Sequence, residues 1–238
     1  ESSFPSYLED HYYREQSPYY ENCITNKETK NIFKFWFFPL NLPLKNISHQ
    51  EEKWANELPK LKKYRFHHSR CYTRIALSKA FNIDPLLIPL KAPPGKPPYL
   101  KKSFGFLSMS HSTDGFFLGW SNKEIGVDIE PINRVTNIKK ISKYLLSKEE
   151  KLFLNHGENE KINERFLSIW VIKEALIKYS KGNILTDFNS WEIDFQKNKA
   201  TNINQKLDIY CNCLKYKSLI VGIASKGEIT RKPKICNF

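Results

Sequence analysis

The segment from Phe166 to Ile177 is the feature that most limits how this chain can fold. Its residues, Phe-Leu-Ser-Ile-Trp-Val-Ile-Lys-Glu-Ala-Leu-Ile, are apolar on almost every side when they are wound into an α-helix. A helix on the surface of a globular protein has one apolar stripe, and a helix that is apolar nearly all round is buried. The sequence therefore predicts a central helix with other elements packed around it.

The polar side chains of this helix form one stripe. Glu174, Lys178 and Lys181 lie at positions i, i+4 and i+7. As surface residues, Glu174 and Lys178 would form an ordinary ion pair worth a few tenths of a kcal/mol. That interpretation accounts for the spacing but not for the apolar surroundings. A partly buried carboxylate requires a partner charge, and a metal ion would serve.

A second pair of acids lies about forty residues upstream, in the segment Ile-Gly-Val-Asp-Ile-Glu that ends at Glu130. In a strand, side chains alternate between faces, so Asp128 and Glu130 point to the same side. Gly126 leaves room for another element to approach the backbone. The alternative for this segment alone is an edge strand with a solvated acidic face.

Asp128, Glu130 and Glu174 suit magnesium, which prefers oxygen ligands and is commonly held by carboxylates together with substrate phosphates. Zinc is disfavoured because the five cysteines and the His67–His68 pair are scattered through the chain. A polar stretch between two apolar runs, Ser110 to Ser112, is a turn by default. We interpret its side chains as hydrogen-bond donors to a ligand, since the chain has no Gly-x-Ser-x-Gly elbow.

These motifs, in this order, resemble those of the 4'-phosphopantetheinyl transferases. The match rests on Gly126–Asp128 and on Trp170-x-x-Lys-Glu-Ala-x-x-Lys178, together with Ser110–Ser112, Gly95–Pro97 and the basic helix Arg70–Lys79. It extends from about residue 62 to 182. The length of 238 residues favours the Sfp-type (surfactin synthetase activator) group, in which one chain forms two similar halves.

The resemblance implies a reaction. Such enzymes move the 4'-phosphopantetheine arm of coenzyme A onto a serine of an apo acyl or peptidyl carrier protein and release adenosine 3',5'-bisphosphate. Asp128, Glu130 and Glu174 would bind Mg²⁺ against the pyrophosphate. The catalytic residues would be Glu174 as the base, Lys178 at the leaving phosphate, and Asp128. Coenzyme A, the co-substrate, would be bound by Arg65, Arg70, Arg74, Lys96, Ser110, His111 and Lys173.

The resemblance also implies an α+β fold of two similar halves related by a pseudo-twofold axis, each with a small antiparallel sheet and a long helix. We expect residues 1–114 to carry the basic helix and the Gly-Lys-Pro loop that bind coenzyme A phosphates. Residues 115–238 would carry the acids and the catalytic helix, with the site in the cleft between the halves. Residues 1–30 are expected to form a loosely packed arm.

Net charge and cysteine content limit the partners. The formal charge of +13 suits an anionic partner, such as an acidic carrier protein or coenzyme A, although lysines scattered over a solvated surface would explain it equally well. Five cysteines without a framework spacing predict free thiols in the cytoplasm. No apolar run is long enough to span a membrane. We expect a monomer that binds neither membrane nor nucleic acid.

Three alternatives remain open at this level. A basic, aromatic-rich nucleic-acid-binding protein would explain the charge but would leave Asp128, Glu130 and Glu174 without a purpose. A metal-dependent phosphodiesterase or phosphatase could use the same three acids, and would usually hold two metal ions. An inactive interaction module is the third alternative.

The remaining elements follow from local signals. Capping boxes at Ser48 and Ser147, each with a glutamate three residues later, predict two short helices. We expect a first strand over 31–40 and a basic helix over 64–81. Strands over 104–109, 116–120 and 123–130 are expected to share one sheet. Strands near 191–195, 207–214 and 218–224 would form a second sheet.

Overall fold

The structure is a computed structural model in which residues 31–229 and 233–237 are described. The described residues divide into two compact units. The first is Phe38–Phe106, and the second is Asn31–Phe37 together with the chain from Leu107 onward. The functional division near residue 114 stays a prediction, as does the pseudo-twofold relation of the halves. The arm expected over residues 1–30 lies outside the described residues.

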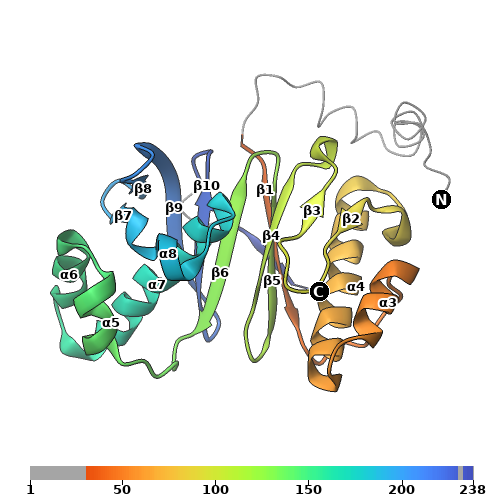
Figure 1. Ribbon diagram of the computed structural model, residues 1–238, viewed down its shortest axis with the longest axis horizontal. Helices are drawn as coiled ribbons and strands as arrows, with labels where there is room; N and C mark the ends of the chain where they lie inside the picture. The colour runs from red at the N-terminus through yellow and green to blue at the C-terminus, as the bar shows by residue number, and fades with distance from the viewer. Residues whose placement is uncertain (1–30, 230–232, 238) are drawn as a thin grey trace. The chain divides into compact units, whose positions relative to one another are not determined.

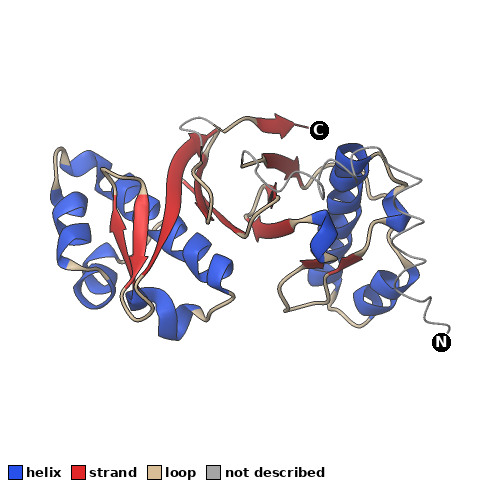
Figure 2. Cartoon of the chain, turned by 90° about the horizontal axis from the view of Figure 1, so that it is seen from above, coloured by secondary structure: helices blue, strands red, loops and turns tan. Residues whose placement is uncertain are grey.

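The first unit is mainly helical (Figure 2). The capping box at Ser48 is confirmed: its side chain accepts from the Glu51 amide, and the Glu51 carboxylate accepts from the Ser48 amide. The long basic helix is confirmed as well and begins four residues earlier than expected. The elements are α3 (His49–Asn56), α4 (Lys60–Phe81), the 3₁₀ turns η1 (Pro85–Leu87) and η2 (Lys102–Phe104), and the two-stranded sheet β2 (Leu90–Lys91) with β3 (Tyr99–Leu100).

The second unit contains two sheets. The first has the strand order β11-β1-β5-β4. Aromatic side chains hold its centre, where the rings of Phe35 and Phe117 stack with centroids 5.8 Å apart. Its strands are β1 (Phe33–Pro39), β4 (Phe106–His111), β5 (Gly115–Ser121) and β11 (Ile235–Asn237).

The second sheet is antiparallel throughout, with the order β6-β10-β9-β8-β7 (Figure 1). The expectation that β6 shares a sheet with β4 and β5 is wrong, because β6 pairs along its length with β10 instead. The Val127 amide of β6 donates to the Ser108 hydroxyl of β4 at 3.0 Å. This contact between the two strands is therefore a bond to a side chain and not a backbone bond of a sheet. The strands are β6 (Ile125–Pro131), β7 (Trp191–Asp194), β8 (Lys199–Asn202), β9 (Leu207–Tyr216) and β10 (Leu219–Ser225).

The predicted central helix packs on this second sheet, against β6 and β10 (Figure 1). Most of the side chains from Phe166 to Ile177 are buried, including Leu167, Val171 and Leu176, each at 0% exposure. It forms the core of the unit together with apolar residues of the shorter helices and the sheet. The helices and turns are α5 (Ile138–Leu145), α6 (Lys148–Asn155), η3 (Asn159–Lys161), α7 (Ile162–Ser180), α8 (Ile184–Asp187) and η4 (Phe188–Ser190).

The fold class is therefore α+β, as the sequence predicts. Within the described ranges, none of the helices combines the length and the apolar character needed to cross a bilayer.

Candidate active site

Asp128, Glu130 and Glu174 meet in space. One carboxylate oxygen from each lies within 4.8 Å of the others, although the residues come from β6 and α7. We refer to these three residues as the acid cluster. The prediction that two distant stretches of chain bring their acids together is confirmed.

Two glycines explain how the helix comes close enough. A Cβ on Gly126 of β6 would lie 1.9 Å from the Ala175 carbonyl oxygen, and one on Gly222 of β10 would lie 2.2 Å from that of Val171. Gly222 is directly opposite Asp128 in the ladder. The backbone of α7 therefore rests on the strand backbones, which places Glu174 beside the acids of β6.

Asp128 is the most buried member of the acid cluster, at 3% exposure. Its Oδ1 accepts from the Lys178 Nζ at 2.7 Å and from the Ser110 hydroxyl at 2.7 Å. Its Oδ2 is buried and has no hydrogen-bond partner within the described residues. A buried carboxylate oxygen without a donor is costly, and its position marks a place for a cation or another donor.

Glu130 has a cation of its own. The guanidinium of Arg134 forms an ion pair with it and also lies over the Trp170 ring, 5.0 Å from the centroid. Burial nevertheless raises the pKa of Glu130, and the Arg134 charge only partly opposes this. The pair is partly exposed, so its contribution to stability is small.

The pKa of Glu174 is raised to about 7, first by burial and then by repulsion from Asp128, while the Lys178 ammonium opposes the rise. A bound cation would lower this pKa; without the ion, burial and the neighbouring acids raise it. The Trp170 indole lowers the pKa of both Glu130 and Glu174. Its N–H is buried and makes no hydrogen bond of normal geometry to any described residue, so this effect is one of proximity.

The donor set fits magnesium. Three carboxylates at this separation offer only oxygen ligands, and the unpartnered Asp128 Oδ2 is one of them. Like charges this close require a counter-ion, and Lys178 and Arg134 supply only part of it. When bound, such an ion would neutralise charge on a diphosphate.

Two of the arginines predicted to bind coenzyme A have guanidinium groups that bind partners within the first unit instead. The Arg74 Nε donates to Glu51 at 2.7 Å, and its remaining nitrogens bond Glu51 and the carbonyls of Pro85, Leu86 and Ile88. Arg70 donates to the Ala92 carbonyl at 2.8 Å and lies over the Phe66 ring. Burial lowers the Arg70 pKa to about 10. Both side chains brace α4 against the segments around it.

Arg65, in contrast, has a half-exposed side chain whose Nε is buried without a partner in the described chain. Lys96 is exposed in the Pro-rich loop. His111 is exposed at the end of β4, where its ring stacks on Phe116 with centroids 5.7 Å apart. Ser110 reaches the acid cluster by donating to Asp128. Lys173 does not reach it, because its ammonium pairs with Glu150 at 2.9 Å.

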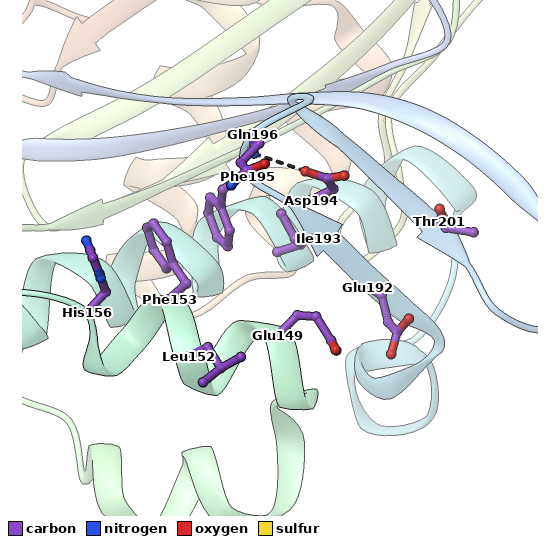
Figure 3. Close-up of a pocket in the computed structure, with 10 residues that line it drawn as sticks. All are labelled: Glu149, Leu152, Phe153, His156, Glu192, Ile193, Asp194, Phe195, Gln196 and Thr201. Atoms are coloured by element: carbon purple, nitrogen blue, oxygen red, sulfur yellow. Dashed lines mark hydrogen bonds between the residues drawn. The ribbon is translucent and has the colours of Figure 1, made fainter.

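A groove of about 590 Å³ lies between α6 and the β7–β8 hairpin (Figure 3). The rings of Phe153 and Phe195 stack on its wall at 3.7 Å between centroids. Its charged lining is acidic, comprising Glu149, Glu192 and Asp194. A polyanion such as coenzyme A would be repelled there, and no member of the acid cluster lines it.

Arg134 is a site residue that sequence reasoning missed. The only sequence signal for Arg134 is its position four residues after Glu130. That spacing brings two side chains together on a helix, but these two residues lie at and beyond the end of a strand. Trp170 belongs to the recognised motif, but its place beside the acids depends on how α7 packs.

Residues 110–226 match the family model described as the 4'-phosphopantetheinyl transferase superfamily. No curated protein matches the chain. The matched segment includes β6, α7 and all three members of the acid cluster. Residues 110–226 therefore form a segment similar to the 4'-phosphopantetheinyl transferase superfamily.

Proposed function

We propose that the protein is an Sfp-type transferase that uses Mg²⁺ to move 4'-phosphopantetheine from coenzyme A to a serine of an apo acyl or peptidyl carrier protein. The observation that carries the proposal is the convergence of Asp128, Glu130 and Glu174 within 4.8 Å, inside the segment that matches the superfamily. Free cysteines, such as Cys71 and Cys211, are in keeping with a cytoplasmic enzyme.

The proposed roles use the geometry of this site. Asp128, Glu130 and Glu174 would hold the ion. Glu174 would accept the proton of the carrier serine, directly or through water. Lys178 is 32% exposed and has ammonium donors beyond the one given to Asp128, so it can face the leaving phosphate.

Arg65, Lys96 and His111 remain our candidates for contact with the phosphates of coenzyme A. Each has an exposed or half-exposed side chain, and Arg65 has an unpaired donor. We leave Arg70, Arg74 and Lys173 out of this role, because their charged groups are committed to buried partners. Ser110 is proposed to orient Asp128 instead.

One experiment tests the proposed function. The protein is mixed with Mg²⁺, coenzyme A and an apo carrier protein, and the carrier is weighed by mass spectrometry. The carrier is expected to gain one phosphopantetheine, and the gain should vanish in EDTA. An unchanged carrier mass across fatty-acid, polyketide and nonribosomal-peptide carriers would reject the transferase.

The base role is tested by Glu174→Gln. This variant is expected to bind coenzyme A with nearly unchanged affinity, measured by calorimetry, but to lose transfer, because the amide cannot take a proton. Turnover above about a tenth of the wild-type value, a barrier difference of only roughly 1.4 kcal/mol, would rule out the base role.

A further inference from the structure

Lys173 and Glu150 form an ion pair that is almost completely buried. The Lys173 Nζ lies 2.9 Å from Glu150 Oε2, and the two side chains are 1% and 0% exposed. Burial is the largest influence on both groups, raising the pKa of Glu150 and lowering that of Lys173. The sequence marks Glu150 only as part of a capping box and does not place it near α7.

Each partner of this pair also binds backbone of other elements. The Glu150 carboxylate accepts from the Ser147 amide at 2.9 Å and from the Ile193 amide of β7 at 3.3 Å. The Lys173 ammonium donates to the Phe188 carbonyl at 3.1 Å and lies 5.0 Å from the centre of the Phe188 ring. The pair thereby ties α6, β7 and η4 to the middle of α7.

Phe188 continues the path toward the acid cluster. Its ring packs on the Trp170 indole with centroids 5.2 Å apart. Trp170 in turn lies under the Arg134 guanidinium, which forms an ion pair with Glu130, and it is about one helical turn before Glu174 on α7. A continuous set of contacts therefore connects the buried pair to the acids.

Stability alone does not account for a buried pair of this kind. Removing two charges from water is costly, and replacing such a pair with well-packed neutral side chains is often neutral or stabilising. The alternative reason to keep a buried ion pair is that it fixes the conformation of the elements around it. Here those elements include α7, which carries Glu174 of the acid cluster.

We propose that Glu150, Lys173 and Phe188 act as a clamp that positions Trp170 and Glu174 for transfer, which makes them positioning residues for the reaction. This inference rests on the proposed function. It gives Lys173 a role within the protein in place of the predicted contact with coenzyme A.

The test compares Lys173→Met, Glu150→Gln and the double variant Glu150→Gln/Lys173→Met. Each single variant leaves one buried charge unpaired and should lower the melting temperature. The double variant is neutral, and its glutamine can still accept from a backbone amide, so most of the melting temperature should return. Its kcat should nevertheless stay at least tenfold below the wild type, with the KM for coenzyme A within about threefold.

A second readout does not depend on turnover. Calorimetric titration with Mg²⁺ alone should show at least threefold weaker binding in the double variant, because Glu174 is less well placed. Phe188→Leu leaves the ion pair intact and should also lower kcat, which tests the same path should the double variant fail to fold. Glu164→Gln is the matched control: Glu164 lies on the same helix as Lys173, the variant breaks its partly exposed pair with Lys215 of β9, and all parameters should stay near wild-type values.

Recovery of kcat together with the melting temperature in the double variant would overturn the clamp and leave the pair a structural role alone. A kcat in Phe188→Leu equal to that of Glu164→Gln would also overturn it. A wild-type protein that transfers nothing in the carrier assay would instead reject the proposed function, so the two failures are distinguishable.

Discussion

Glu174 illustrates how neighbouring side chains set the chemistry of a single group. A solvated glutamate is ionised well below neutral pH, but burial and the charge of Asp128 raise the pKa of Glu174 to about 7. The ionised acid cluster is therefore unfavourable without a cation. The acid cluster binds a cation when one is present, and binding of the metal ion releases protons from such a site.

The metal-free protein should accordingly lose stability as the pH rises. The folded-state pKa of Glu174 is raised, so its contribution is fully present below about pH 4.5 and is lost as the pH rises through about 7. Glu174→Gln removes this loss. In EDTA, the variant should be more stable than the wild type at pH 8, by on the order of 2 kcal/mol, and nearly equal to it at pH 5. Urea unfolding at both pH values measures the difference.

Variant and wild type are compared at the same pH, because Glu150 also has a raised pKa and, lying outside the acid cluster, affects both proteins alike. Saturating Mg²⁺ should reverse the order at pH 8, since the variant lacks one ligand. A difference between variant and wild type that is the same at pH 5 and pH 8 would contradict the assignment of the pH dependence to Glu174.

At the scale of elements, the site depends on how closely α7 approaches β6. Gly126→Ala should separate them, because the new Cβ would meet backbone atoms at 1.9 and 2.6 Å, and backbone cannot rotate away. We expect a loss of more than about 3 kcal/mol in the free energy of unfolding, at the upper end of overpacking costs. Urea unfolding gives this value, and Mg²⁺ affinity should fall with it.

Gly157→Ala is the matched control. Gly157 has a positive φ of 82° but an open surrounding, where the nearest atom to a new Cβ is 3.9 Å away. This substitution should cost roughly 1–2 kcal/mol from backbone conformation alone. Equal losses in the two variants would show that close packing of α7 is not what makes Gly126 necessary.

At the scale of the whole molecule, the formal charge of +13 is expected to act on the encounter with the carrier. Charges exposed to solvent are screened over about 8 Å at physiological ionic strength. The KM for an acidic carrier should therefore rise between about 50 and 500 mM NaCl, while kcat changes little. Steady-state kinetics against a fixed concentration of coenzyme A measures this.

A carrier KM that does not depend on salt would show that the net charge has no part in recognition. A carrier variant with its acidic surface residues neutralised is the control, since its KM should be higher at low salt and nearly insensitive to salt. The acidic groove between α6 and the β7–β8 hairpin shows that charge on this protein varies from place to place, which a net value does not reveal.

Much of the site could be predicted because its signals are local in sequence. Alternation puts Asp128 and Glu130 on one face, helical spacing puts Lys178 one turn after Glu174, and Gly126 marks a close approach. The capping boxes at Ser48 and Ser147 are confirmed for the same reason, because each involves residues three apart.

Tertiary structure alone decided which charged groups are committed to partners within the protein. Arg74 and Lys173 carry the same charge as Arg65 and Lys96, but their partners are Glu51 and Glu150, which lie 23 residues away for Arg74 and on a different helix for Lys173. The sheet to which β6 belongs was decided in the same way, by pairing with a strand almost a hundred residues later. Charge and periodicity belong to the residue and its near neighbours. Pairing and burial depend on which distant segments meet, and many such arrangements are compatible with the same local pattern.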